Sequence, residues 1–307
     1  MQSYERKLKE IETYDLIVIT GPTATGKTSI AARLAAEIEG EIISADSRQV
    51  YRKMDLGTGK DLDDYIVNGK KIPFHLIDIA EPGYEYNVFE FQRDFFDAFL
   101  DIKSRGKRPI LCGGTGMYIE AAISEYKLIE VPENSDLRKT LLTKTDEELQ
   151  NILVSMRKLH NTSDTSDRKR LIRAIEIEQY YSDNPQIPSE TPKINSIIFG
   201  INKPRDEVRE RITKRLKQRL ETGMIEEVEL LLENGVTPEK LKYYGLEYKF
   251  LTQYILGEIT YEQMFSQLNT AIHQFAKRQM TWFRRMEKKG FNIIWVESYE
   301  EVKAQIV

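Results

Sequence analysis

The segment GPTATGKT at residues 21–28 matches the pattern G-x-x-x-x-G-K-[ST] at every fixed position. It follows the β-branched run Leu16–Thr20, which is typical of a buried parallel strand, and precedes helical periodicity at Ser29–Glu39. Between a strand and a helix, such glycines let backbone N–H groups surround an anionic phosphate, while the lysine adds charge and the threonine hydroxyl can coordinate Mg²⁺. The sequence therefore predicts a di- or triphosphate site made by Gly21, Thr23, Ala24, Thr25, Gly26, Lys27 and Thr28.

Strand-like and helical segments alternate after this loop. Glu41–Asp46 and Pro109–Gly113 are strand-like, and an amphipathic helix is expected at Val88–Lys103. Asn195–Ile201 is strand-like again. This alternation predicts an α/β fold with a doubly wound parallel sheet.

The alternation of strands and helices stops at about residue 125. Short, strongly charged helical stretches lead to a polar, proline-rich connector at Ser182–Pro192. Long amphipathic helices are then expected at Val208–Glu233 and Tyr261–Lys289. We therefore predict a core formed by residues 1–122 and 196–307, interrupted by a small helical insertion domain at 123–195.

Composition excludes several classes of protein. The 307 residues include 40% hydrophobic and 31% charged side chains, enough for a sizeable core. One cysteine excludes a disulfide framework, and three histidines beside it leave no zinc finger. The absence of an apolar run of membrane-spanning length and the charged start MQSYERKLKE favour a cytoplasmic protein with no membrane contact.

Charge is distributed unevenly along the chain. The formal net charge is −4, yet residues 136–219 carry 18 basic and 13 acidic side chains. We expect this excess to make the insertion net positive and to favour contact with nucleic acid. The alternative on charge alone is a set of solvated helix faces.

Two further strand ends carry polar groups. Asp46 follows the second strand in SADSRQVY, where a carboxylate could bind Mg²⁺ through water or accept a proton from a nucleophile. Thr115 follows the third strand in GGTGMY, where its hydroxyl can donate to a developing oxyanion. The alternatives are a turn-capping Asp46 and an ordinary strand-to-helix turn at Thr115.

Three segments together resemble a known family. GPTATGKT, ISADSRQVYRKMDLGTGK and CGGTGMYI, in this order and spacing, resemble the tRNA dimethylallyltransferase (tRNA isopentenyltransferase) family. FHLIDIAEP at Phe74–Pro82, DRKRLIRAIEI at Asp167–Ile177 and HQFAKRQMTWFRR at His273–Arg285 also match, so the resemblance covers nearly the whole chain. It implies a P-loop NTPase-like fold that hydrolyses no nucleotide. The implied reaction moves a dimethylallyl group from dimethylallyl diphosphate to N6 of the adenine just 3′ of the anticodon in tRNA.

The resemblance also implies roles for individual residues. Asp46 matches the general base, and Lys27, Thr115 and Mg²⁺ held at Thr28 would stabilise the leaving diphosphate. The expected contacts to tRNA come from Asp46, Ser47, Arg48 and Gln49, from Arg138, Lys169, Arg170 and Arg173 in the insertion, and from Lys277 and Arg278 in the tail. In the tail, the competing interpretation is a helix with a buried face and solvated charges. A monomer is expected.

The chain departs from the family pattern in two places. Tyr244-Gly245-Leu246-Glu247 stands where the family usually has G-Y-[KR]-E, so a cation expected to touch RNA is missing. Gly57-Thr58-Gly59-Lys60-Asp61 stands in for G-T-A-K-P. Three alternatives stay open: an adenylate isopentenyltransferase acting on free AMP, ADP or ATP, a P-loop small-molecule kinase, and a non-catalytic RNA-binding protein.

Overall fold

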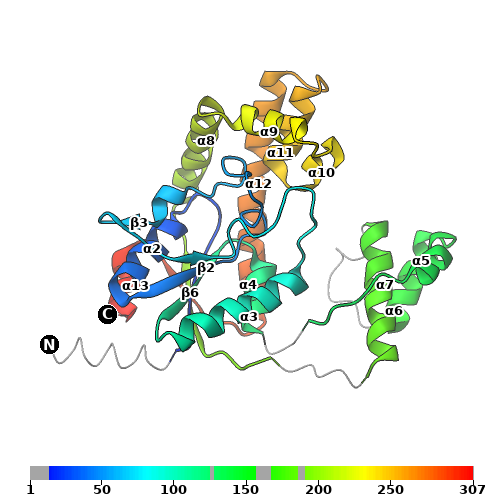
Figure 1. The fold of residues 1–307 in the computed structure, drawn as a ribbon, viewed down its shortest axis with the longest axis horizontal. Helices are drawn as coiled ribbons and strands as arrows, with labels where there is room; N and C mark the ends of the chain where they lie inside the picture. The colour runs from blue at the N-terminus through cyan, green and yellow to red at the C-terminus, as the bar shows by residue number, and fades with distance from the viewer. Residues whose placement is uncertain (1–13, 125–127, 157–166, 186–190, 307) are drawn as a thin grey trace. The chain divides into compact units, whose positions relative to one another are not determined.

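The computed structural model describes residues 14–124, 128–156, 167–185 and 191–306 (Figure 1). The chain forms two compact units. The core unit contains Met1–Ser124 and Pro192–Val307, and the insertion unit contains Glu125–Thr191. In the described ranges, no helix is both long and apolar enough to cross a membrane.

A six-stranded parallel sheet forms the centre of the core unit, in the order β5-β2-β6-β1-β7-β8. β1 lies between β6 and β7, so that Val18 is opposite Leu111 on one side and Ile198 on the other. This confirms the predicted parallel α/β sheet. The strands are β1 (Leu16–Thr20), β2 (Gly40–Ser44), β5 (Phe74–His75), β6 (Arg108–Gly113), β7 (Ser196–Ile201) and β8 (Ile293–Val296).

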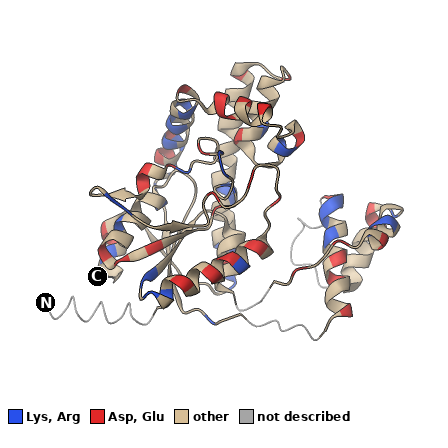
Figure 2. Cartoon of the chain, viewed as in Figure 1, with Lys and Arg blue, Asp and Glu red and all other residues tan. Residues whose placement is uncertain are grey.

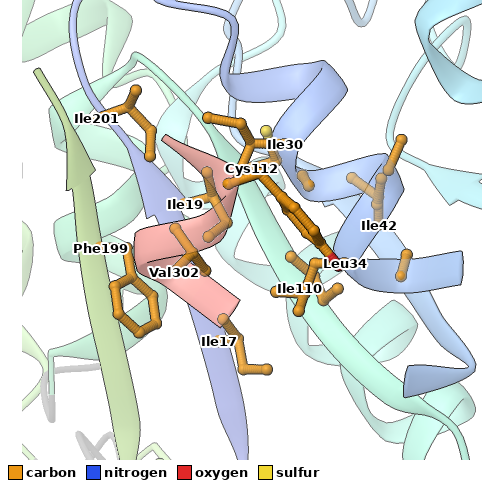
Figure 3. Packing of buried hydrophobic residues seen from close by; sticks show 14 of the residues in the cluster. Ile17, Ile19, Ile30, Leu34, Ile42, Ile110, Cys112, Phe199, Ile201 and Val302 are labelled. Atoms are coloured by element: carbon orange, nitrogen blue, oxygen red, sulfur yellow. The ribbon is translucent and has the colours of Figure 1, made fainter. Parts of the chain in front are cut away.

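Alternate residues of the central strands enter two different apolar layers. Ile17, Ile19 and Phe199 pack on one face of the sheet with α2 (Lys27–Ile38) and α13 (Tyr299–Ile306), as Figure 3 shows. Their neighbours along the strands, including Val18, pack on the other face with α3 (Val88–Ser104) and α4 (Gly116–Ile123). Because side chains alternate along a strand, both faces of the sheet are covered, as a doubly wound fold requires.

Short elements connect β2 to β5. They are the 3₁₀ helix η1 (Leu62–Tyr65) and a two-stranded antiparallel hairpin of β3 (Ile66–Val67) and β4 (Lys70–Lys71). Tyr65 is buried against α2 and the sheet, and it anchors the segment between β2 and β5 to the core.

The C-terminal half of the core unit is a helical cluster around one long helix. Its members are α8 (Arg205–Glu221), α9 (Met224–Glu233), α10 (Pro238–Tyr243), α11 (Leu246–Ile255) and α12 (Tyr261–Lys288). The prediction of one helix over Val208–Glu233 is wrong, because Gly223 has φ 108° and separates α8 from α9. α12 begins at a capping box formed by Thr260 and Gln263.

The insertion unit has its own apolar core. Leu141, Leu149, Leu153 and Leu171 are buried among α5 (Ser135–Leu142), α6 (Asp146–Met156) and α7 (Arg168–Asp183). Such a core explains why this stretch separates from the sheet as a unit.

The expected positive charge of the insertion is wrong. Residues 125–191 carry 10 basic and 13 acidic side chains, whereas residues 192–219 carry 9 basic and 3 acidic ones. The excess therefore lies in the core unit, largely on α8, where Figure 2 shows a concentration of Lys and Arg. The charge count over residues 136–219 assigned this excess to the insertion because the range extends past the insertion into α8.

Phe199→Ala tests the sheet core. Phe199 is fully buried, so truncation leaves a cavity and should lower the free energy of unfolding by about 3–5 kcal/mol. Denaturant titration followed by circular dichroism measures this change. Leu100→Ala, at an exposed position on α3, is the control and should change stability by less than about 1 kcal/mol. Equal losses in both variants would contradict the assigned core.

Candidate functional site

A cavity of about 500 Å³ opens in the core unit, at the carboxyl ends of β1, β2 and β6. Its walls come from the phosphate-loop segment, the segments after β2 and β6, and helices α8, α11 and α12. In open α/β sheets, ligands bind at this edge because the strand-to-helix loops converge there. Predicted residues from all three strand ends thus line one cavity. Of the predicted phosphate-site residues, Gly21 and Thr25 do not line it, and the buried Thr25 hydroxyl donates to the Pro22 carbonyl at 2.9 Å.

The phosphate loop is held in shape by a close backbone approach. Gly21 has φ 139°, and a Cβ there would collide with the carbonyl oxygen of Ile201 on β7. Gly26, at φ 83°, starts α2 as its N-cap. Both conformations favour glycine, which explains these two positions of the motif. The N-terminus of α2 consequently faces the cavity, as a phosphate site requires.

Lys27 and Thr28 line the cavity together. The Lys27 ammonium donates to the carbonyl oxygen of Pro22 at 2.7 Å. The pKa of Lys27 is lowered to about 8, mainly by burial; the nearby Arg215 guanidinium acts in the same direction, while Cys112 and Asp46 oppose the shift. A bound anion would favour the charged form and raise this pKa.

Asp46 combines a capping role with access to the cavity. Its Oδ1 accepts a hydrogen bond from the Arg48 N–H at 2.9 Å, and its side chain also lines the cavity. The turn-capping bond that was considered as an alternative is therefore present. It orients the Asp46 carboxylate, which still lines the cavity. Ser47, Arg48 and Gln49 line the same cavity.

Thr115 connects the ends of β2 and β6. Its hydroxyl oxygen accepts from the Ser47 N–H at 3.1 Å, and its own N–H donates to the Ala45 carbonyl at 3.1 Å. Since the hydroxyl oxygen is already an acceptor, its proton is available for a ligand or for the Ser47 hydroxyl at 3.5 Å. Thr115 is thus placed as a donor at the cavity wall.

Two arginines of α8 enter the site, and the sequence analysis did not select them. Arg215 donates to the Thr23 hydroxyl at 2.5 Å, while Arg219 forms two bonds with Asp61 at 2.7 and 2.9 Å. Burial, followed by the charge of Arg219, lowers the pKa of Arg215 to about 10. Their spacing of four residues places both on one helix face. Because α8 contains many other charged residues, this spacing does not distinguish them in the sequence.

Gln279 of α12 was also missed. Its Oε1 accepts from the Thr23 N–H at 2.8 Å, and its Nε2 donates to the Gly114 carbonyl at 2.9 Å. This side chain therefore joins the phosphate loop to the loop after β6. In the predicted tail pair, Arg278 lines the cavity, whereas Lys277 lies in a separate hollow beside α8.

The two departures from the family pattern lie around the same cavity. Gly57, Gly59 and Asp61 line it from one segment, and Leu246 and Glu247 from the start of α11. Burial raises the pKa of Glu247. Glu247 therefore adds a carboxyl group to a cavity that is also lined by Asp46, Asp61 and Asp64, and either it or Leu246 stands where the family pattern has a cation, depending on the register of the match.

Two of the predicted cations in the insertion unit form internal ion pairs. Arg138 contacts Glu176 at 2.9 Å and Glu133 at 2.6 Å, and Arg173 also pairs with Glu176. Arg173 further donates to the Val131 carbonyl at 2.6 Å. Lys169 and Arg170, by contrast, are exposed at the start of α7.

Fold and site together define a class. The parallel α/β sheet, the phosphate-binding loop, the carboxylate at a strand end and the two arginines of α8 are the features of a P-loop NTPase-like protein. In the described ranges, no group of three His, Cys, Asp or Glu side chains could hold a metal ion alone.

Comparison with known proteins identifies the family. Residues 49–286 match the family model described as IPP transferase, and residues 14–76 match isopentenyl transferase. The chain is 61% identical to tRNA dimethylallyltransferase 2 of Bacteroides fragilis over 93% of each chain, and 60% identical to tRNA dimethylallyltransferase 1 of Parabacteroides distasonis over 94% of each. The crystal structure of tRNA isopentenylpyrophosphate transferase from Bacillus halodurans has a TM-score of 0.67 and 30% identity, covering 95% of this chain and 96% of that one. This chain belongs to the tRNA dimethylallyltransferase family.

Lys27 should make diphosphate binding depend on pH. As pH rises through about 8, the lysine loses its proton and its attraction for the anion, so affinity for inorganic diphosphate with Mg²⁺ should fall between pH 7 and 9.5. Calorimetric titration measures this. Lys27→Met is the control for titration of the ligand itself: it should bind at least about 10-fold more weakly at pH 7 and show a flatter profile. Parallel profiles would exclude Lys27 as the titrating group.

Proposed function

We propose that this chain is a tRNA dimethylallyltransferase. It transfers the dimethylallyl group from dimethylallyl diphosphate to N6 of the adenine 3′-adjacent to the anticodon, forming isopentenyladenosine and releasing diphosphate. The observation that carries the proposal is the shared cavity of Lys27, Asp46 and Thr115. This cavity contains an anion site at Lys27 and a base at Asp46, and membership of the family indicates the class of substrate.

The diphosphate end of the substrate would lie at the phosphate loop. Backbone N–H groups at the start of α2, the Lys27 ammonium and the Arg215 guanidinium supply positive potential there. Charge on the diphosphate grows as its bond to carbon breaks, so these groups stabilise the transition state more than the ground state. Thr115 adds a neutral donor to the same wall.

The adenine amine would lie beside Asp46. The N6 lone pair forms the new bond to C1 of the dimethylallyl group while the C1–O bond breaks and its electron pair leaves with diphosphate. Asp46 accepts the proton from N6. The bond from the Arg48 N–H to Oδ1 orients the carboxylate for this transfer.

Mg²⁺ is part of the proposal. Thr28 would hold it together with diphosphate oxygens, with Asp46 reached through water, a ligand set of the kind that Mg²⁺ prefers. When bound, the ion supplies neutralisation of the leaving diphosphate. The proposal also includes a monomeric enzyme, and a tRNA substrate is consistent with a cytoplasmic one.

An adenine in an anticodon loop must leave its stack to reach such a cavity. Ser47, Arg48, Gln49 and Arg278 line the cavity and would surround the base. In the insertion unit, the exposed Lys169 and Arg170 are the proposed tRNA contacts. Arg138 and Arg173 both pair with Glu176, and their contact with tRNA stays a prediction.

Asp46→Asn should lower turnover at least about 10²-fold, the usual scale for loss of a general base, with tRNA affinity nearly unchanged. The assay uses radiolabelled dimethylallyl diphosphate, Mg²⁺ and unmodified tRNA, with AMP in a parallel reaction. Asp97→Asn, exposed on α3, is the control and should retain full activity.

The assay discriminates between the related activities. Label in tRNA that disappears with Asp46→Asn supports the proposal. Label in AMP alone would assign the chain to adenylate prenylation, and label in neither would refute transferase activity on both acceptors. A near-normal rate for Asp46→Asn would refute the role of Asp46 as base.

The insertion unit should contribute to tRNA affinity through Lys169 and Arg170. Changing both to Ala should weaken tRNA binding about 3- to 30-fold and reduce its salt dependence, because phosphate contacts release counterions. Filter binding at several KCl concentrations measures this. Arg138→Ala should instead destabilise the insertion unit, since it leaves the buried Glu176 with one guanidinium fewer. Unchanged affinity and salt slope for the double variant would remove this surface from the tRNA contact.

A further inference from the structure

A second hollow lies on the opposite face of α12 from the cavity. Phe275 and Arg278 of α12 face the cavity, whereas His273 and Lys277 face the hollow. Its volume is about 710 Å³, and α8 forms its other wall. A neighbouring hollow of about 570 Å³ between the same helices shares His273 and Arg209 with it. Both belong to the core unit.

These two adjoining hollows, which together we name the cationic groove, are lined by the ion-paired Lys203 and by six further cations. Glu210 and Glu297 are the acidic residues that line it, and burial together with the charge of Arg209 lowers the pKa of His273. His273 therefore adds little positive charge at neutral pH. The six cations are Arg205, Arg209, Lys214 and Lys217 of α8 and Lys277 and Arg284 of α12.

These six side chains differ from most other cations of the core unit. Among the described residues, none of the six forms an ion pair. Lys203, which precedes α8 and also lines the groove, and Arg211 of α8 both contact Glu207, at 3.8 and 2.7 Å. All six are exposed. Their mutual repulsion is therefore not relieved within the protein, and an external anion would relieve it.

The extent of the groove indicates the kind of anion. Arg205 and Lys217 are separated by twelve residues of helix, or about 18 Å at a rise of about 1.5 Å per residue. A small phosphorylated molecule would reach only part of this length. A nucleic-acid duplex carries a phosphate about every 3.4 Å along each strand, so successive phosphates can contact cations at both ends of the groove.

The surface chemistry favours RNA over a protein partner. Among the described residues, the large exposed apolar side chains do not include any that line the groove. Val208 and Ile212 are buried beneath it. A protein interface would be expected to present an apolar centre, whereas a phosphate backbone requires cations.

We propose that the cationic groove binds the phosphate backbone of a tRNA stem outside the anticodon loop. The inference rests on the proposed function in naming tRNA as the RNA. It also relocates part of the RNA-binding surface from the insertion unit to α8.

The test compares two variants of equal charge. Arg205, Arg209, Lys214 and Lys217 are changed together to Gln, and Lys53, Lys70, Lys71 and Lys249, exposed lysines outside the groove, are changed together to Gln as the control. Each variant loses four positive charges, so a general effect of net charge is matched. Affinity for unmodified tRNA is measured by filter binding between 50 and 250 mM KCl, with circular dichroism to verify folding.

The groove variant should bind tRNA at least about 10-fold more weakly at 150 mM KCl. The slope of log K against log salt should shrink by about 2 to 4, because up to four phosphate contacts are lost. The control should stay within about threefold of the wild type. In the transfer assay at saturating tRNA, the KM for dimethylallyl diphosphate should be unchanged.

Two results would overturn the proposal. One is a groove variant with the affinity and salt slope of the control. The other is a raised KM for dimethylallyl diphosphate with tRNA binding intact, which would make the groove a site for the small substrate. The binding measurement needs no turnover, so a groove-dependent salt slope in a protein without transferase activity would refute the proposed function alone.

Discussion

The two hydrogen bonds of Gln279 hold the site together. Its Oε1 accepts a hydrogen bond from the Thr23 N–H of the phosphate loop, and its Nε2 donates one to the Gly114 carbonyl after β6. Gln279 is nearly buried, so losing either bond would leave a polar group unsatisfied at an expense of about 1–3 kcal/mol. Through this residue, α12 fixes the distance between the anion site and the wall that contains Thr115. The strands of the sheet position the phosphate loop and the loop after β6, and α12 of the helical cluster sets the distance between them.

The cavity concentrates positive charge that the fold only partly neutralises. Arg219 has Asp61 as a partner, whereas Lys27 and Arg215 form hydrogen bonds to neutral oxygens. Burial lowers the pKa of both, to about 8 and about 10. A diphosphate entering this space would meet donors that are already oriented, with little reorganisation required. This is the arrangement expected where charge develops on a leaving group.

Local patterns predicted the parts of the site that lie within single segments. The phosphate loop could be recognised because glycines, lysine and threonine follow one strand directly, and Asp46 and Thr115 because they end strands of the same sheet. Arg215 and Gln279 come from helices nearly two hundred or more residues away, and only packing brings them to Thr23. The charge of the insertion was assigned wrongly for a different reason: the basic residues were counted over 136–219, a range that extends past the predicted end of the insertion at residue 195 and includes most of α8. Within the helical cluster, one glycine with positive φ divides what looked like a continuous helix.

The two segments that depart from the family pattern touch each other. Tyr248, next to Glu247, packs so closely on Gly57 that a Cβ there would lie 2.5 Å from its ring, and its hydroxyl donates to Glu227 at 2.7 Å. Glu227 in turn accepts the N–H groups of Asp55, Leu56 and Gly57. The start of α11 and the loop after β2 are therefore a single interlocked unit. A displacement of either segment would therefore be transmitted to the other, and so to both sides of the cavity wall that they form.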